Sequence, residues 1–308
     1  MSSIIGKKIS KRVFFKFLLR DIDIYIHSGE ITGLLGPSGS GKSTLLKVLS
    51  LIDTEFSGDL IHSGFDRRTD ISRSMGYVNQ SDILNPGLSV IDTLYYSYRI
   101  RNHVKQGNEQ VIKEIKDLIK SFNLETRMHA RLKNLSGGER KRVHIINELL
   151  SAPSFLFLDE PLSGLDPANA DRIIRFLQKY AKNGNTVVMT THSMDSMDYL
   201  HKVYYLSRGR LIFYGKTEEI AQHFSSNSIS ESYKKVIRQN PEFLVKLFQK
   251  SSGYKQLNSL IDGFEPYKLQ QNPMKVIQGC DKEIHKGNSI DEEFRNIIDR
   301  IRDKKENE

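Results

Sequence analysis

The sequence is short of cysteine, tryptophan and long apolar runs. Its 308 residues include one cysteine, Cys280, and no tryptophan. A single cysteine excludes a disulfide bond within the chain, and nothing in the sequence calls for an oxidising compartment. No stretch approaches the roughly 18–20 uninterrupted apolar residues that a membrane-spanning helix needs. Lys16 and Arg20 interrupt the apolar run that follows the basic start, and no small-residue cleavage site comes after it, so we expect no signal peptide.

The charged residues are unbalanced in sign, with an excess of basic side chains. There are 46 Lys and Arg against 37 Asp and Glu, which gives a formal net charge of +9. Such an excess fits binding to nucleic acid or to an anionic membrane surface. The basic residues are scattered along the chain, however, so we interpret them as a solvated, lysine-rich surface. The length suggests one or two domains.

Residues 36–44 read Gly-Pro-Ser-Gly-Ser-Gly-Lys-Ser-Thr. A short apolar strand over 29–35 precedes them, and residues 42–51 have the apolar spacing of a helix, which is the context that a phosphate-binding loop requires. Its glycines let successive backbone N–H groups converge on an anion, Lys42 supplies a mobile charge for the outer phosphates, and the Ser43 hydroxyl can bind Mg²⁺. The predicted ATP contacts are Gly36, Pro37, Ser38, Gly39, Ser40, Gly41, Lys42, Ser43 and Thr44.

A second motif follows a run of four apolar residues, Phe155 to Leu158, and consists of the two acids Asp159 and Glu160. A continuous apolar run is typical of a strand that is covered on both faces. We expect Asp159 to hold Mg²⁺ through its water shell. Glu160 is the candidate general base, because a carboxylate beside the terminal phosphate can polarise the attacking water.

A third motif, Leu-Ser-Gly-Gly-Glu, occupies residues 135–139. Ser136 is a good helix N-cap, and Glu139 three residues later predicts a capping box. The simplest interpretation is therefore a well-capped helix. Gly137 and Gly138 would also expose backbone N–H groups at the start of that helix, which makes a second anion site.

With these motifs in this order, the chain resembles an ATP-binding cassette (ABC) ATPase from about Ile9 to about Phe224. The resemblance implies an α/β fold: a P-loop NTPase core with a parallel sheet, an N-terminal antiparallel β subdomain and a helical insert at about 85–150. It implies ATP and Mg²⁺ as cofactors. The predicted domains are an ATPase domain over 1–224 and, over 225–308, a linker with a helical C-terminal extension.

The resemblance also assigns roles to single residues. Gln80 would bind the metal and sense the γ-phosphate, as the Q-loop does, and His192 would be the switch histidine. The implied catalytic group is thus Glu160, His192 and Gln80, with Ser43, Gln80 and Asp159 at the metal. Ser136, Gly137, Gly138 and Glu139 match the signature motif, which in the family contacts the ATP of a second cassette. Asp166 would lie at the seam of that head-to-tail dimer.

Within the family, residues 135–143 and 76–84 look most like the G, or eye-pigment, subfamily. Leu162 and the stretch 191–194 depart from that subfamily, and residues 190–195 and 209–215 are more like general prokaryotic exporter ATPases. The sequence therefore leaves the transported cargo open. It also leaves open which aromatic residue would stack on adenine. The candidates are Phe14, Phe15 and Phe17, and each is at least as well explained by packing in the N-terminal sheet.

The resemblance implies an ATPase at the cytoplasmic face of a membrane, bound there peripherally to a separately encoded permease and paired with a second cassette, most simply a copy of itself. The loop 83–88 would line the groove for that permease. The alternative is an ABC ATPase that acts on nucleic acid or ribosomes. Those relatives carry a second cassette or a coiled-coil insertion, and this chain has neither, so we expect no nucleic-acid partner.

Two further segments carry helical patterns. An apolar stripe over 111–122 predicts an amphipathic helix of the insert. After a linker at 225–228, Asn240 and Pro241 predict the N-cap and first residue of a helix, another apolar pattern covers 294–301, and the charged end 302–308 is expected to fray. The extension has no motif, and it could dock on the cassette, aid dimerisation or bind a partner.

Overall fold

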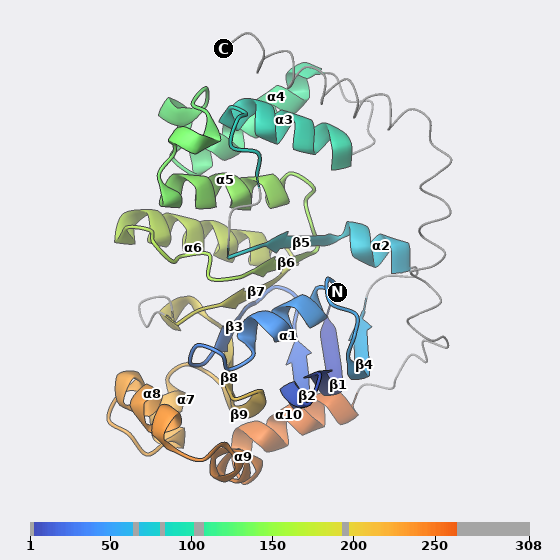
Figure 1. The fold of residues 1–308 in the computed structure, drawn as a ribbon, viewed down its shortest axis with the longest axis vertical. Coiled ribbons are helices and arrows are strands. Elements are labelled where there is room, and N and C mark those ends of the chain that lie inside the picture. The colour runs from blue at the N-terminus through green and yellow to red at the C-terminus, as the bar shows by residue number, and fades with distance from the viewer. Residues whose placement is uncertain (1–2, 64–67, 81–83, 102–107, 193–196, 264–308) are drawn as a thin grey trace. The chain divides into compact units, whose positions relative to one another are not determined.

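The structure is a computed structural model that describes residues 3–63, 68–80, 84–101, 108–192 and 197–263. These residues lie in one compact unit that runs from Met1 to Phe264. Figure 1 shows how its helices and strands follow one another. The predicted positions Ile83, Cys280, 193–195, 294–301 and 302–308 fall outside the described residues.

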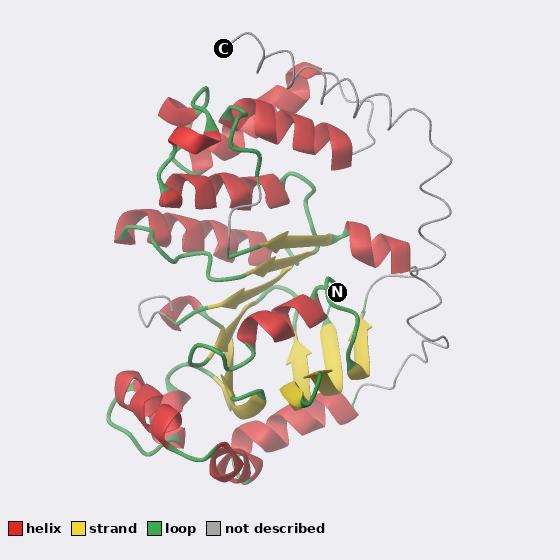
Figure 2. Ribbon diagram, viewed as in Figure 1, coloured by secondary structure: helices red, strands yellow, loops and turns green. Residues whose placement is uncertain are grey.

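The chain begins with a small antiparallel sheet. Its strands are β1 (Ile4–Val13), β2 (Lys16–Ile26) and β4 (Ser57–His62), in the order β2-β1-β4. Strand β1 pairs antiparallel with both neighbours. Alternate residues of β2 are fully buried at Ile22 and Ile24, as the period of two along a strand requires. The N-terminal antiparallel subdomain expected from the resemblance is present (Figure 2).

The central sheet has six strands in the order β5-β6-β7-β3-β8-β9. The strands are β3 (Ile31–Leu35), β5 (Met75–Val78), β6 (Phe155–Leu158), β7 (Thr186–Thr190), β8 (Lys202–Ser207) and β9 (Arg210–Gly215). All neighbours pair in parallel except β8 and β9. The carboxyl ends of β5, β6, β7 and β3, four adjacent strands, therefore meet at one edge of the sheet.

Helices cover both faces of this sheet, which explains the uninterrupted apolar run of β6. Leu156 and Leu158 face one core together with α3 (Val90–Arg101), α4 (Asn108–Ser121), α5 (Gly137–Leu149) and α6 (Pro167–Lys182). Phe155 and Phe157 face the other core, which contains α1 (Lys42–Leu49) and the N-terminal sheet. The P-loop NTPase architecture and the helical insert are confirmed. The short α2 (Arg68–Arg73) precedes β5.

The C-terminal helices of the compact unit pack on the cassette. They are α7 (Glu219–His223), α8 (Ile229–Arg238), α9 (Pro241–Gln249) and α10 (Ser252–Asp262). The predicted start of α9 is confirmed, since Asn240 is its N-cap and Pro241 follows. Helix α9 packs against β9, and α10 packs against β2 and β9. A Cβ at Gly253 would lie 2.1 Å from the Tyr214 carbonyl oxygen, so only glycine permits this approach. Docking on the cassette is thus the observed arrangement up to α10, and the compact unit ends well beyond residue 224.

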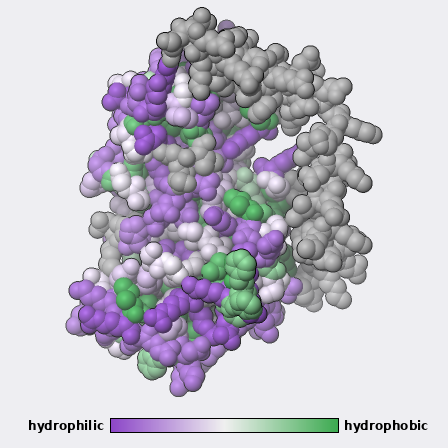
Figure 3. All heavy atoms as spheres, viewed as in Figure 1, coloured by the Kyte–Doolittle hydropathy of each residue, from purple (hydrophilic) through white to green (hydrophobic). Residues whose placement is uncertain are grey.

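Among the described helices, none is long and apolar enough to cross a membrane. The face of the molecule in Figure 3 is mostly hydrophilic, with smaller apolar groups among the hydrophilic ones. The apolar stripe predicted in the insert is core: Val111, Ile115 and Ile119 of α4 are fully buried.

Candidate active site

The loop between β3 and α1 has the backbone of an anion cradle. Gly36, Gly39 and Gly41 have φ angles of 144°, 74° and 102°, which side chains other than glycine rarely adopt. At Gly36 a Cβ would lie 2.3 Å from the Leu206 carbonyl oxygen, so the loop also presses against β8. Helix α1 begins at Lys42. Its free N–H groups and its dipole favour an anion in front of the loop.

Lys42 and Ser43, at the start of α1, make hydrogen bonds within the loop and to the acid that follows β6. The Lys42 ammonium donates to the carbonyl oxygens of Gly36 and Pro37, at 2.8 and 3.0 Å. Burial lowers the pKa of Lys42, and the carboxylates of Glu160 and Asp159 act in the opposite direction. The Ser43 hydroxyl donates to Asp159 Oδ1 at 3.0 Å. The hydroxyl and the carboxylate assigned to the metal are therefore in direct contact.

Glu160 lies between the two other residues assigned to catalysis. Gln80 Nε2 donates to Glu160 Oε2 at 3.1 Å, and His192 Nδ1 lies 3.2 Å from Glu160 Oε1. Gln80 follows β5, Glu160 follows β6 and His192 follows β7. Parallel pairing of adjacent strands thus brings together three residues that are far apart in the sequence.

Thr190, which the sequence analysis did not select, connects the two acids. Its hydroxyl donates to Asp159 Oδ1 at 2.7 Å and accepts a hydrogen bond from the Glu160 backbone N–H at 2.8 Å. Glu160 has a φ of 49°, an unusual conformation for a residue other than glycine, and this contact helps to hold it. In the sequence, the signal for Thr190 was its position: it is a polar residue at the end of an apolar strand, two positions before His192.

The signature motif has the predicted capping box. Ser136 Oγ accepts a hydrogen bond from the Glu139 N–H at 3.2 Å, and the Glu139 carboxylate accepts one from the Ser136 N–H at 2.8 Å. Burial alone would raise the pKa of Glu139, but its hydrogen bonds from Ser136 and Arg127 outweigh that effect and lower it. A Cβ at Gly137 would meet no atom within 4 Å, so the start of α5 is open to a ligand.

The signature motif and Gln80 line one cavity of about 520 Å³. Asp166 lines the same cavity and is the N-cap of α6. Its Oδ1 accepts a hydrogen bond from the Asn169 N–H at 3.0 Å, and this bond and a second one from the Asn169 side chain hold the pKa of Asp166 below its usual value. Of the predicted contacts to a second cassette, Ser136, Gly137, Gly138, Glu139 and Asp166 all border this cavity.

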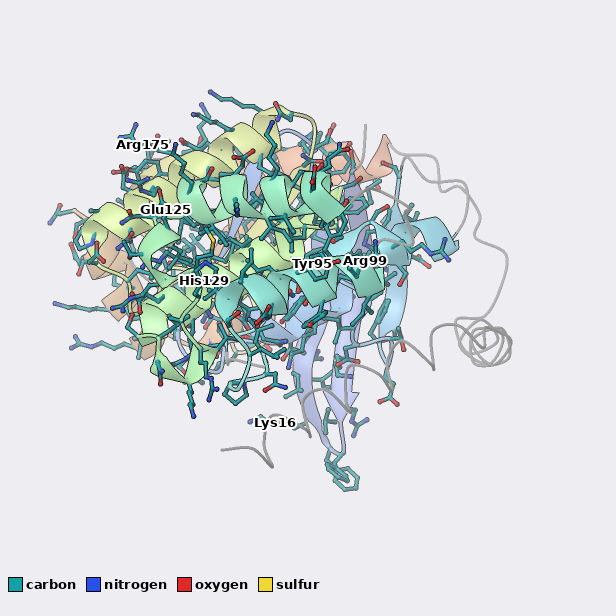
Figure 4. All side chains as sticks on the ribbon, turned by 90° about the horizontal axis from the view of Figure 1, so that it is seen from above. Lys16, Tyr95, Arg99, Glu125, His129 and Arg175 are labelled. Atoms are coloured by element: carbon teal, nitrogen blue, oxygen red, sulfur yellow. The ribbon has the colours of Figure 1, made fainter. Side chains whose placement is uncertain are left out.

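The aromatic candidates for adenine lie on the β1–β2 hairpin, which projects from the rest of the unit near Lys16 in Figure 4. Phe14 and Phe15 are 91% and 92% exposed, and Phe17 is 44% exposed. Packing inside the N-terminal sheet therefore does not explain Phe14 or Phe15. Phe17 is flanked by the guanidinium groups of Arg12 and Arg20, at 5.5 and 5.4 Å from its ring centre. Which of the three rings stacks on adenine stays a prediction.

Comparison with protein families gives a match over residues 19–163 to the family described as "ABC transporter". A second family, an AAA domain described as a putative AbiEii toxin of a type IV toxin–antitoxin system, matches over 131–198. This second match covers the signature motif and the acids that follow β6.

Curated relatives include ABC transporter G family members. Member 26 of Arabidopsis thaliana is 38% identical over 242 residues, which are 76% of this chain and 35% of that protein. Member 22 of the same plant is 37% identical over 254 residues, 79% of this chain and 33% of that protein. Member 1 of Dictyostelium discoideum is 34% identical over 232 residues, 72% of this chain and 29% of that protein. The chain thus spans about a third of the length of the relatives it matches.

The solved structures that resemble this chain are ATP-binding cassettes. One is a dimeric cassette in a post-hydrolysis state bound to ADP and Pi, with a TM-score of 0.63 and 26% identity over 69% of this chain and 98% of that chain. Another dimeric bacterial cassette has a TM-score of 0.64 and 27% identity, with the same coverage. The chain thus shares the fold of these cassettes over 69% of its length. The chain contains an ABC transporter ATP-binding domain and belongs to the ATP-binding cassette ATPases.

Proposed function

We propose that this chain hydrolyses ATP as half of a head-to-tail cassette dimer and thereby powers transport through a membrane-spanning partner. The observation that carries the proposal is the convergence of Lys42, Ser43, Asp159, Glu160 and His192 at the carboxyl ends of three adjacent strands, β6, β7 and β3. The signature motif lies apart from the P-loop on α5, with its first glycine open. That separation is what a site completed by a second chain requires.

Mg²⁺ fits the residues at this site. Ser43 and Asp159 provide a hydroxyl and a carboxylate oxygen 3.0 Å apart, which are hard oxygen donors of the kind that Mg²⁺ prefers. In the described residues no cluster of three or more His, Cys, Asp or Glu could hold a metal on its own. This agrees with a metal that is bound through one or two protein groups together with phosphates. When bound, Mg²⁺ would neutralise charge on the outer phosphates.

Glu160 is our candidate for the general base. Its carboxylate has one oxygen toward Gln80 and the other toward His192, so these two side chains hold its orientation. A water that this carboxylate polarises would then be aligned by groups from three strands. Gln80 and His192 position Glu160. A contact between either side chain and the γ-phosphate would therefore change the position of Glu160.

Replacing Lys42 by alanine tests the phosphate site. The change removes a charged donor to the phosphates that is worth about 2–3 kcal/mol, so ATP binding should weaken by about 30- to 150-fold. Titration of ATP against the isolated protein measures the effect. Lys47→Ala, which removes an exposed lysine from the same helix, is the matched control and should bind ATP normally. An affinity of Lys42→Ala within threefold of wild type contradicts the assignment.

A small cavity marks where we place the membrane partner. It measures about 270 Å³, and it is lined by the apolar Leu84, Pro86 and Leu132 and by the basic Lys133 and Arg140. In the loop before it, Leu84 and Leu88 are half-buried, and Leu84 packs against the main core. The loop follows Gln80 closely, so a group seated in the cavity would lie near the active site. We propose that an apolar element of the membrane-spanning partner occupies this groove.

Leu84→Asp should weaken recruitment to membranes that contain this partner, since it places a charge where an apolar element would dock, and burying an uncompensated carboxylate costs several kcal/mol or more. Co-purification with native membranes measures recruitment, and ATP titration checks that the variant is folded. Ile237→Asp is the control, because Ile237 is 50% exposed on α8 and outside the cavity lining. Unchanged recruitment of Leu84→Asp contradicts the groove. ATPase activity stimulated by nucleic acid, with no membrane association, contradicts the transport function itself.

A further inference from the structure

One buried lysine connects three motifs of the site and has no role assigned so far. Lys141 belongs to α5 and is only 6% exposed. Its ammonium donates to the carbonyl oxygens of Asn79 and Gln80, at 2.9 and 3.0 Å, and to that of Asp159 at 3.4 Å. Lysine is among the residues least often buried, and a buried ammonium is stable only when its donors are satisfied.

These three acceptors belong to the chain's own phosphate site. Asn79 and Gln80 directly follow β5, and Asp159 directly follows β6. Charge-assisted hydrogen bonds are stronger than neutral ones and hold their partners at a short distance. The Lys141 ammonium therefore fixes the backbone of the Q-loop and of the metal-binding acid to one another and to α5.

The same helix presents the signature motif. Lys141 lies one turn after Gly137 and Gly138, and the capping box holds the start of the helix in place. The next residue, Arg142, is also buried and donates to the Asn169 side chain, which in turn donates to Asp166. Two consecutive residues of α5 thus contact different parts of the site: Lys141 contacts the chain's own phosphate site, and Arg142 is linked through Asn169 to Asp166.

A helix is stiff along its axis, so a shift of the Q-loop backbone would move the start of α5 with it. The Lys141 ammonium joins the Asn79 and Gln80 carbonyl oxygens to α5. Removing the Lys141 ammonium would leave these carbonyls and α5 to move independently.

We propose that Lys141 is a positioning residue that couples two sites. Nucleotide binding in a chain's own phosphate site would, through Lys141, change the position of the signature motif on the same chain, and that motif contacts the ATP of the partner. This inference deepens the proposed function and depends on it. It gives a physical route by which occupation of one composite site would bias the other, since each α5 belongs to one phosphate site and completes the other.

Hydrogen exchange tests the coupling without hydrolysis. The full chain is diluted until it is monomeric, a non-hydrolysable ATP analogue is added with Mg²⁺, and exchange is followed over 36–44 and 137–142. In wild type, nucleotide should slow exchange in both segments. In Lys141→Met the P-loop should keep its protection, whereas the nucleotide-induced protection of α5 should fall by about 5- to 150-fold, the range typical of coupling between sites. Lys116→Met, which changes an exposed lysine of α4, is the matched control.

Steady-state turnover adds a second readout. Lys141→Met should lower kcat and the cooperativity of ATP hydrolysis while the affinity of the monomer for nucleotide changes by less than threefold. Lys141→Arg keeps a cationic donor and should fall between wild type and Lys141→Met in both assays. Equal protection of α5 in wild type and in Lys141→Met overturns the inference. The inference is also overturned if Lys141→Met and Lys141→Arg lose folding or nucleotide binding to the same extent. A wild type that shows the coupled protection but no ATPase activity contradicts the proposed function and leaves the coupling intact.

Discussion

Glu160→Gln is expected to lower ATP turnover by about 10²–10⁴-fold, because an amide keeps the size and polarity of the side chain but cannot take a proton from water. ATP binding should persist, since Lys42, Ser43 and Asp159 are unchanged. The variant should then accumulate as an ATP-bound dimer that wild type forms only transiently. Phosphate release measures turnover, and size-exclusion chromatography with ATP measures the dimer.

The matched control is Glu125→Gln, which changes an exposed glutamate outside the active site. It should hydrolyse ATP like wild type. A Glu160→Gln protein with near wild-type turnover would show that another group polarises the water. Loss of ATP binding in the variant would show instead that the contacts of Glu160 with Gln80 and His192 hold the site together and that the carboxylate acts through them.

Ser136→Arg is expected to abolish ATP-dependent dimerisation and hydrolysis together. Arginine adds bulk and charge at the open start of α5, where the γ-phosphate of the partner's ATP must dock. Each chain should still bind ATP, because Lys42 lies outside the cavity that the signature motif lines. ATP titration, chromatography with ATP and phosphate release measure the three properties on one preparation.

This substitution also removes a helix N-cap, which costs about 1 kcal/mol of stability. Ser228→Arg controls for that loss, because Ser228 caps α8 by accepting from the Glu231 N–H at 3.1 Å, and the new arginine carries the same charge. Ser228→Arg should dimerise and hydrolyse ATP normally. A Ser136→Arg protein that still dimerises with ATP would show that the signature motif is not in the interface.

The parts of the fold that local chemistry determines were predictable from the sequence. The apolar run before Asp159 predicted a strand covered on both faces, and the alternation of its residues between two cores shows why no polar position interrupts it. The capping box of Ser136 and Glu139 and the N-cap at Asn240 depend on neighbours within a few residues, and both were found as predicted.

Features that depend on tertiary contacts were not predictable. The sequence around Lys141 predicts a lysine at the surface of a polar helix. Its three carbonyl acceptors come from the segments that follow β5 and β6, which approach α5 only in the folded chain. Docking of α10 depends on a glycine, Gly253, meeting a carbonyl of β9. Phe14 and Phe15 are apolar like core residues, yet they are 91% and 92% exposed at the turn of the β1–β2 hairpin.

The composite site is tested most directly by mixing Ser136→Arg protein with Lys42→Ala protein and measuring ATP hydrolysis. Each variant alone should be inactive. In a heterodimer, the intact P-loop of one chain meets the intact signature motif of the other and restores one site. Random pairing makes half of the dimers mixed, so the mixture should regain about a quarter of wild-type activity. Two folded variants whose mixture regains no activity would contradict a site shared between chains.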